Sequence, residues 1–91
     1  MDKEAKVKMS KQLNVTDLSG EKVMVDFDNG KYFMIKGVGN DIWDMLGEQE
    51  ISVTEIIDRL MGEYEVTADV CEKEVLEFLN RMESLGIIEA K

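Results

Sequence analysis

Few residues in this chain are of the types that carry out chemistry. Its 91 residues include one cysteine, Cys71, no histidine, and 20 aspartates and glutamates. Without histidine, the usual base that activates a serine or cysteine nucleophile is missing. A zinc site would have to combine Cys71 with carboxylates, which is a poor ligand set. The residue types therefore argue against an enzyme that acts alone and against a metal or other cofactor.

Cys71 and the glutamates around it have a structural interpretation. Cys71 falls in the apolar stripe of a predicted helix, as a buried structural thiol does. A reactive thiol needs a nearby cation or a helix N-terminus, and Cys71 lies within about one turn of the start of its helix. A thiol-dependent activity therefore stays open as an alternative. The acidic residues of this helix are interpreted as a solvated outer face: Glu72, Glu74, Glu77 and Glu83.

The composition is that of one ordinary globular domain spanning residues 1–91. The chain is 44% hydrophobic and 34% charged, which is not a disordered composition. No apolar run approaches the roughly 20 residues that span a bilayer, and Met1 to Gln12 lacks the apolar segment of a signal peptide. A single cysteine forms no internal disulfide, so we expect a reducing, cytoplasmic location and no membrane partner. The net charge of −9 would repel a phosphate backbone and argues against nucleic acid.

A hairpin from Lys22 to Lys36 is the element around which the rest of the chain is organised. Alternating residue types before Asn29-Gly30 and after it predict two strands joined by a two-residue turn. This turn predicts four facing pairs: Asp28 with Lys31, Phe27 with Tyr32, Val25 with Met34, and Met24 with Ile35.

The segment before the hairpin has a weaker pattern. Leu13, Val15 and Leu18 predict a short first strand, with Ser19-Gly20 as the turn that follows it. Residues 1–12 are rich in lysine and weakly patterned, so we expect them to be frayed or disordered.

Three helices are predicted after the hairpin. The first runs from Gly39 or Asn40 to Gly47, with Ile42, Trp43 and Leu46 facing inward. The second opens on a capping box from Ser52 to Glu55 and has one apolar face: Val53, Ile56, Ile57, Leu60, Met61 and Tyr64. The third runs from Ala68 to Leu85, between a Thr67 cap and Gly86. Its inward stripe is Cys71, Val75, Phe78, Leu79, Met82 and Leu85.

These elements predict an α+β fold in which a three-stranded antiparallel sheet is followed by a three-helix bundle. Such a small sheet has an edge, and an edge strand presents unpaired N–H and C=O groups. The strand from Lys31 to Lys36 is apolar over Tyr32-Phe33-Met34-Ile35. An exposed strand of this kind can bind an extended peptide by strand addition.

The order and spacing of these motifs resemble the family of PQQ-synthesis protein D. The resemblance rests first on Gly30-Lys31-Tyr32-Phe33-Met34-Ile35, followed by Gly39-x-x-Ile42-Trp43-x-x-Leu46. It continues with Ser52-Val53-Thr54-Glu55-Ile56-Ile57 to Tyr64, and with Val75-Leu76-Glu77-Phe78-Leu79 to Ile87-Ile88. It covers about Glu21 to Ile88. The Gly39 to Trp43 corner resembles stand-alone elements of lasso-peptide and related pathways more than the cofactor-pathway member itself, and Met1 to Gly20 matches nothing distinctive.

This resemblance implies a winged-helix-like fold and a role in recognising ribosomally made precursor peptides. A leader peptide would bind as an extra strand, and the protein would present the precursor to a modifying enzyme, namely a protease, a cyclase or a radical SAM enzyme. The implied peptide-binding residues lie on the edge strand and on the third helix: Lys31, Tyr32, Phe33, Met34, Ile35, Cys71, Glu74, Val75, Phe78, Leu79, Arg81 and Met82.

A second function is compatible with the predicted layout of helices. A winged-helix transcriptional regulator would place its third helix in the major groove of DNA. The charge of −9 and the scarcity of Lys and Arg on that helix oppose this alternative.

Overall fold

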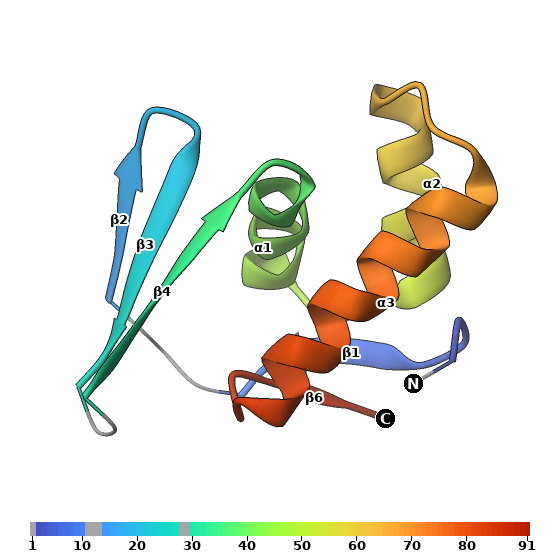
Figure 1. Cartoon of the computed structure of the whole chain (residues 1–91). Coiled ribbons are helices and arrows are strands. Elements are labelled where there is room, and N and C mark those ends of the chain that lie inside the picture. Colours follow the sequence, from blue (N-terminus) through green and yellow to red (C-terminus); the bar gives the residue numbers. More distant parts are fainter. Residues whose placement is uncertain (1, 11–13, 28–29) are drawn as a thin grey trace.

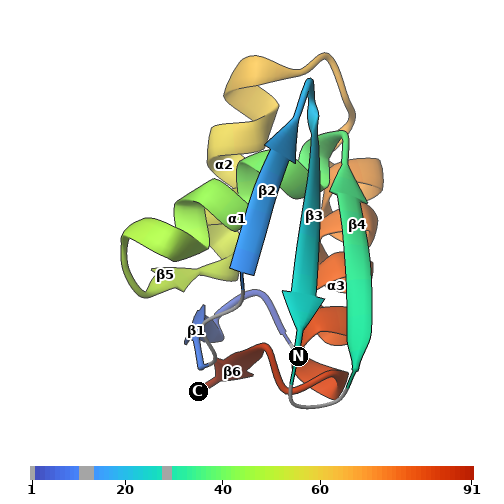
Figure 2. The same ribbon diagram turned by 90° about the vertical axis from the view of Figure 1, so that its left-hand side faces the viewer.

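The computed structural model describes residues 2–10, 14–27 and 30–91. These residues form three helices and two small antiparallel sheets, which confirms the predicted α+β class and is compatible with a winged-helix-like fold. The strand order is β2-β3-β4 in one sheet and β5-β1-β6 in the other. The three helices lie on one side of the β2-β3-β4 sheet (Figures 1 and 2).

The β2-β3-β4 sheet is the one that the sequence predicts. It consists of β2 (Asn14–Leu18), β3 (Glu21–Asp26) and β4 (Lys31–Lys36). The predicted first strand is confirmed, although Leu13 lies outside the described residues. Ser19 and Gly20 form the predicted turn, and both have positive φ angles, of 25° and 87°.

The predicted register of the β3–β4 hairpin is wrong by two residues. Asp26 pairs with Lys31 and Val25 with Tyr32, so four residues connect the strands and Phe27 has no partner on β4. The other predicted pairs are replaced by Met24 with Phe33 and Val23 with Met34, and Asp28 lies outside the described residues. The alternating pattern specifies which face a side chain takes, and a shift of two residues preserves every face. The pattern therefore could not distinguish the two loop lengths.

The expectation of a disordered start is wrong for residues 2–10. Lys6–Met9 form β1, and Val7 is 0% exposed. This strand lies between β5 (Ile51–Ser52) and β6 (Ile88–Ala90), and the backbone N–H groups of residues 6 and 91 each donate to the other's carbonyl. A four-residue strand whose partners lie far along the chain leaves little local signal in the sequence.

The helices begin and end close to the predicted positions. They are α1 (Val38–Glu48), α2 (Val53–Glu63) and α3 (Ala68–Ser84). The Ser52 hydroxyl accepts from the Glu55 N–H at 3.1 Å, and the Thr67 hydroxyl accepts from the Val70 N–H at 3.3 Å. Gly86 adopts the left-handed conformation, with φ 76°, that a helix C-terminus of this kind requires.

One hydrophobic core joins the helices to both sheets. Ile42 and Leu46 of α1 are buried in it, and Trp43 packs against it while half-buried. Met61 and Tyr64, predicted as part of the apolar face of α2, are exposed. The fully buried side chains come from every layer: Val7, Met24, Ile42, Val53, Ile56, Leu60, Val75, Leu79, Met82 and Ile87. No helix in the described part of the chain is long and apolar enough to cross a membrane.

Candidate functional site

The strand β4 is an edge of its sheet. It pairs with β3 along one side, and within the described residues no strand lies against its other side. Its side chains alternate between two environments. Phe33 and Ile35 point toward the helices and pack against the core, whereas Tyr32 and Met34 are 74% and 51% exposed. The open side of β4 is therefore flanked by apolar side chains.

A groove of about 430 Å³ runs between the carboxyl-terminal half of β4 and helix α3. In Figure 2, α3 lies behind β4 and runs in the opposite direction, from its orange start to its red end. The start of α1 closes the groove at one end. Its lining residues are Met34, Ile35, Lys36, Val38, Gly39, Glu74, Glu77, Phe78 and Arg81.

Gly39 allows the floor of this groove to be closely packed. A Cβ atom at this position would lie 2.8 Å from Cγ2 of Ile35 and 3.1 Å from Cε2 of Phe78. Both distances are shorter than an ordinary van der Waals contact, so Ile35 and Phe78 reach the backbone of α1 only because residue 39 has no side chain. The groove floor thus depends on contacts among β4, α1 and α3.

The charges of the groove are separated along α3. Glu74 and Glu77 lie on the turns nearest the start of α1, and Arg81 lies one turn further on. In the part of the chain that the structure describes, none of these three side chains takes part in an ion pair. The groove therefore offers both signs of charge to a ligand.

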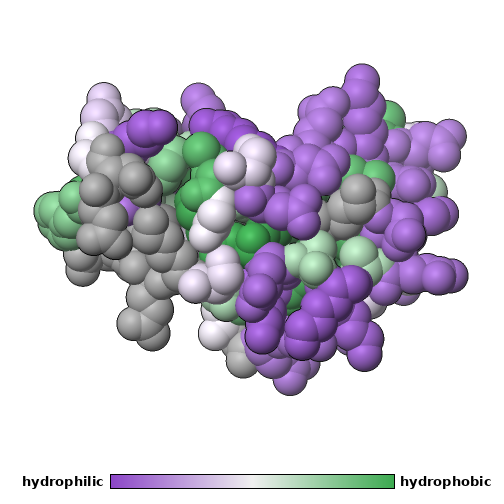
Figure 3. Space-filling view, turned by 90° about the horizontal axis from the view of Figure 1, so that it is seen from below, coloured by the Kyte–Doolittle hydropathy of each residue, from purple (hydrophilic) through white to green (hydrophobic). Residues whose placement is uncertain are grey.

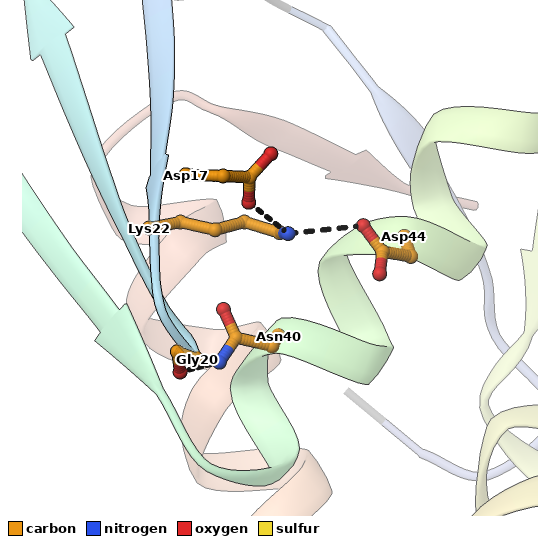
Figure 4. Close-up of polar contacts among 5 residues, drawn as sticks. All are labelled: Asp17, Gly20, Lys22, Asn40 and Asp44. Atoms are coloured by element: carbon orange, nitrogen blue, oxygen red, sulfur yellow. Dashed lines mark hydrogen bonds and ion pairs between the residues drawn. The ribbon is translucent and has the colours of Figure 1, made fainter.

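The sheet is held at a fixed position over α1 by polar contacts. The Lys22 ammonium, on a side chain that is 11% exposed, lies 2.8 Å from Asp17 of β2 and 3.3 Å from Asp44 of α1 (Figure 4). The hydrogen bond to Asp17 raises the pKa of Lys22 above 10.5, and it outweighs the lowering by burial; Asp44 raises this pKa further. Beside this bridge, the Asn40 side-chain amide donates to the carbonyl of Gly20. These contacts join the hairpin that carries β4 to the helix that carries Gly39.

The surface seen from below differs between its two sides. Hydrophilic side chains dominate the right of the view, on the helical side, and apolar side chains gather toward the middle, near the sheet (Figure 3).

In the described residues, no group of three Cys, Asp or Glu side chains is arranged to hold a metal ion.

Comparison with models of known protein families identifies the family of this chain. A model of the family described as coenzyme PQQ synthesis protein D (PqqD) matches residues 21–88. This chain belongs to the PqqD family. The match confirms the resemblance read from the sequence over about Glu21 to Ile88.

One solved structure extends the likeness of this PqqD-family chain to its three-dimensional form. It is TbiB1 in complex with the TbiA(beta) leader peptide, with a TM-score of 0.79 and 28% sequence identity. The alignment covers 90% of this chain and 94% of TbiB1. A search of curated proteins gave no match.

The structure separates the predicted site residues of this PqqD-family chain into three groups. Met34, Ile35, Glu74, Phe78 and Arg81 line the groove, and Lys31, Tyr32 and Phe33 continue the same strand away from it. The remaining residues, all on α3, are buried in the core: Cys71, Val75, Leu79 and Met82. Their side chains support the helix from behind and do not reach the groove.

Four lining residues were not named as site residues from the sequence: Lys36, Val38, Gly39 and Glu77. Of these, Lys36 lies within the predicted edge strand and Glu77 within the third helix that was predicted to wall the groove. Glu77 lies three residues after Glu74 and four before Arg81, so helical spacing alone could have placed it on the same face. Val38 and Gly39 belong to the start of α1, and only the packing of α1 against α3 brings them to the groove.

Cys71 is not poised for reactivity. Its side chain is buried, and its thiol lies 3.9 Å from the carbonyl oxygen of Ile57. Burial raises the pKa of the thiol above 9.0, and the charge of Glu74 raises it further. Since the thiolate is the reactive form, this environment opposes a thiol-dependent activity.

Proposed function

We propose that this protein is a non-catalytic binding module that captures the leader peptide of a ribosomally synthesised precursor. The leader adds to the open side of β4 as a further strand, and α3 forms the other wall of its binding groove. The observation that carries the proposal is the open edge of β4 beside an apolar groove, in a chain similar to TbiB1, which was solved with a leader peptide. Backbone pairing supplies affinity in this mode of recognition, and side-chain pockets supply selectivity.

The partners of the proposal are a leader peptide and the enzyme that modifies the precursor. The enzyme is a protease, a cyclase or a radical SAM enzyme, and the binding step takes place in the cytoplasm, where the precursor is made. Residues 1–91 act as a single recognition domain in this proposal.

The exposed surface of α3 supports peptide binding over DNA binding. Beside Lys73 and Arg81, this helix carries five exposed or half-buried acidic side chains: Asp69, Glu72, Glu74, Glu77 and Glu83. A helix of this charge would be repelled by phosphates in a major groove.

Binding of a labelled leader peptide tests the proposal. The leader of the precursor encoded beside this protein's gene is titrated and followed by fluorescence anisotropy, and saturable binding is expected. Met34→Glu places a charge on the rim of the groove, so the dissociation constant should rise about tenfold or more.

Met61→Glu is the matched control, because Met61 is also exposed but lies on α2, outside the groove. This variant should bind as the wild type does, and circular dichroism should show that both variants keep their helices. Absence of saturable binding by the wild type, or equal loss in both variants, would contradict the proposal.

A further inference from the structure

The arrangement of charges along the groove carries information about the ligand. An added strand places alternate side chains toward α3 and the others toward the outer face of the sheet. Those that point toward α3 meet Glu74, Glu77, Phe78 and Arg81, whereas those that point outward meet Tyr32 and Lys36.

The order of these groups follows from the antiparallel course of α3 and β4. Phe78 lies at the level of Ile35, since both approach Gly39. Glu74 also contacts the small cavity with Val38 and Leu60, so it lies toward the end of β4 that Lys36 occupies. Arg81, on the next turn beyond Phe78, lies toward the Lys31 end. The α3 wall of the groove therefore presents an acidic pair, an apolar floor and a cation in that order, while Lys36 of β4 lines the groove at its acidic end.

The spacing of these groups suits a strand. Glu77 and Arg81 are about 6 Å apart along the helix axis, and Glu74 and Arg81 about 10 Å. Two residues of an antiparallel strand span about 6.8 Å, and four span about 13.6 Å. The first and third of three alternate side chains are thus about 3 Å further apart than Glu74 and Arg81. The long, flexible side chains of lysine, glutamate and arginine span this difference, so the three reach the acidic pair, the floor and the cation in turn.

We propose that the groove selects a leader segment with the pattern basic–x–apolar–x–acidic, read from its N-terminus; this inference rests on the proposed function. The basic side chain pairs with Glu74 and Glu77, the apolar one covers Ile35 and Phe78, and the acidic one pairs with Arg81. The direction follows because antiparallel pairing is the more stable per residue. An antiparallel guest on β4 starts at the Lys36 end, where the acidic pair lies.

Two synthetic peptides of identical composition test this order. Each is capped at both termini and labelled; one carries lysine, leucine and glutamate at alternate positions separated by threonines, and the other carries glutamate, leucine and lysine. Because their net charges are equal, the overall charge of −9 acts alike on both. One exposed ion pair changes affinity by up to about fivefold, so two pairs give a preference of about tenfold for the lysine-first peptide at low salt. This preference should shrink as salt is added.

A double variant that exchanges the groove charges provides the decisive comparison. Glu77→Arg combined with Arg81→Glu keeps the net charge and should abolish or reverse the preference. Lys73→Glu combined with Glu83→Lys makes the same exchange on α3 outside the groove and should leave the preference unchanged. Circular dichroism confirms that both variants are folded, since all four side chains are exposed.

Equal affinity for the two peptides, a preference for the glutamate-first peptide, or a preference that survives the Glu77–Arg81 exchange would overturn the charge order. If neither synthetic peptide binds but the precursor's own leader does, the charge pattern is wrong and the proposed function stands. If that leader does not bind either, the proposed function fails.

Discussion

At the scale of single residues, Gly39 has the most direct effect on the groove. Its flexibility is not needed for the backbone, which is helical here. What is needed is the absence of a Cβ atom, because Ile35 and Phe78 occupy that space. The residue links the shape of the groove floor to the packing of three elements.

Gly39→Ala should therefore destabilise the protein. Crowding of Ile35 and Phe78 costs about 1–3 kcal/mol, which exceeds the gain of at most about 1 kcal/mol from the higher helix propensity of alanine. Urea denaturation should show a lower unfolding free energy, and leader affinity should fall because the groove floor has shifted.

Gly47→Ala is the matched control for this substitution. Gly47 lies in the same helix, but nothing lies within 4 Å of the place that its Cβ atom would occupy. This variant should gain about 0.5–1 kcal/mol of stability. Equal stability of the two alanine variants would show that the close approach at Gly39 is unimportant.

At the scale of elements, the hydrogen-bonding groups on the open side of β4 are determined by the alternating direction of backbone N–H and C=O groups along a strand. The two-residue Ser19–Gly20 turn makes Leu18 and Glu21 the first pair of the β2–β3 ladder. Counting from that pair, the backbone N–H and C=O groups of successive β3 residues point in turn to β2 and to β4. We therefore expect the N–H groups of β4 that point to the open side to be those of Tyr32, Met34 and Lys36.

Met34→Pro should consequently remove a donor that only the guest strand uses. The fold should survive, because an edge strand tolerates proline where its N–H faces outward, while leader affinity should fall at least about tenfold. Met34→Ala keeps the N–H and should retain more affinity than the proline variant. Phe33→Pro removes a bond to β3 and should destabilise the sheet by about 1–3 kcal/mol. If Met34→Pro binds as well as Met34→Ala, strand addition at β4 is contradicted.

Helix ends are the elements that local sequence describes best. The Ser52 and Thr67 caps and the Gly86 terminus occur where they were predicted, because each depends on a hydrogen bond or a φ angle within a few residues. The hairpin register depends instead on the number of residues in the loop. The alternating sequence pattern is the same for the predicted two-residue loop and the observed four-residue loop.

At the scale of the whole molecule, Lys22 couples the sheet to the helical part. Its ammonium joins Asp17 and Asp44, and its pKa is raised above 10.5 by these carboxylates. A group whose pKa is higher in the folded state stabilises the fold below its unfolded pKa. That contribution is lost as the pH rises through the folded pKa.

Comparison of the wild type with Lys22→Met should show this dependence. The wild type should be more stable by about 1 kcal/mol at pH 7, and the difference should decrease as the pH rises above 10.5. Lys22→Arg should keep its stability advantage over Lys22→Met at high pH, because the guanidinium stays charged. Thermal unfolding at a series of pH values measures all three proteins, and a difference independent of pH would refute the role of the Lys22 charge.

By itself, the sequence determined the α+β class, the three helices with their caps, the strand that forms the edge and the family. These follow from periodicity and from contacts between residues close along the chain. Only the tertiary structure decided the β5-β1-β6 sheet, the register of the hairpin, and which side of α3 faces the groove. The first of these joins segments from both ends of the chain. Cys71, Val75, Leu79 and Met82 are buried as their place in the predicted inward stripe of α3 indicates. That Phe78 of the same stripe lines the groove was decided only by the packing of α3 beside β4 and α1, because burial depends on neighbours that the local sequence does not contain.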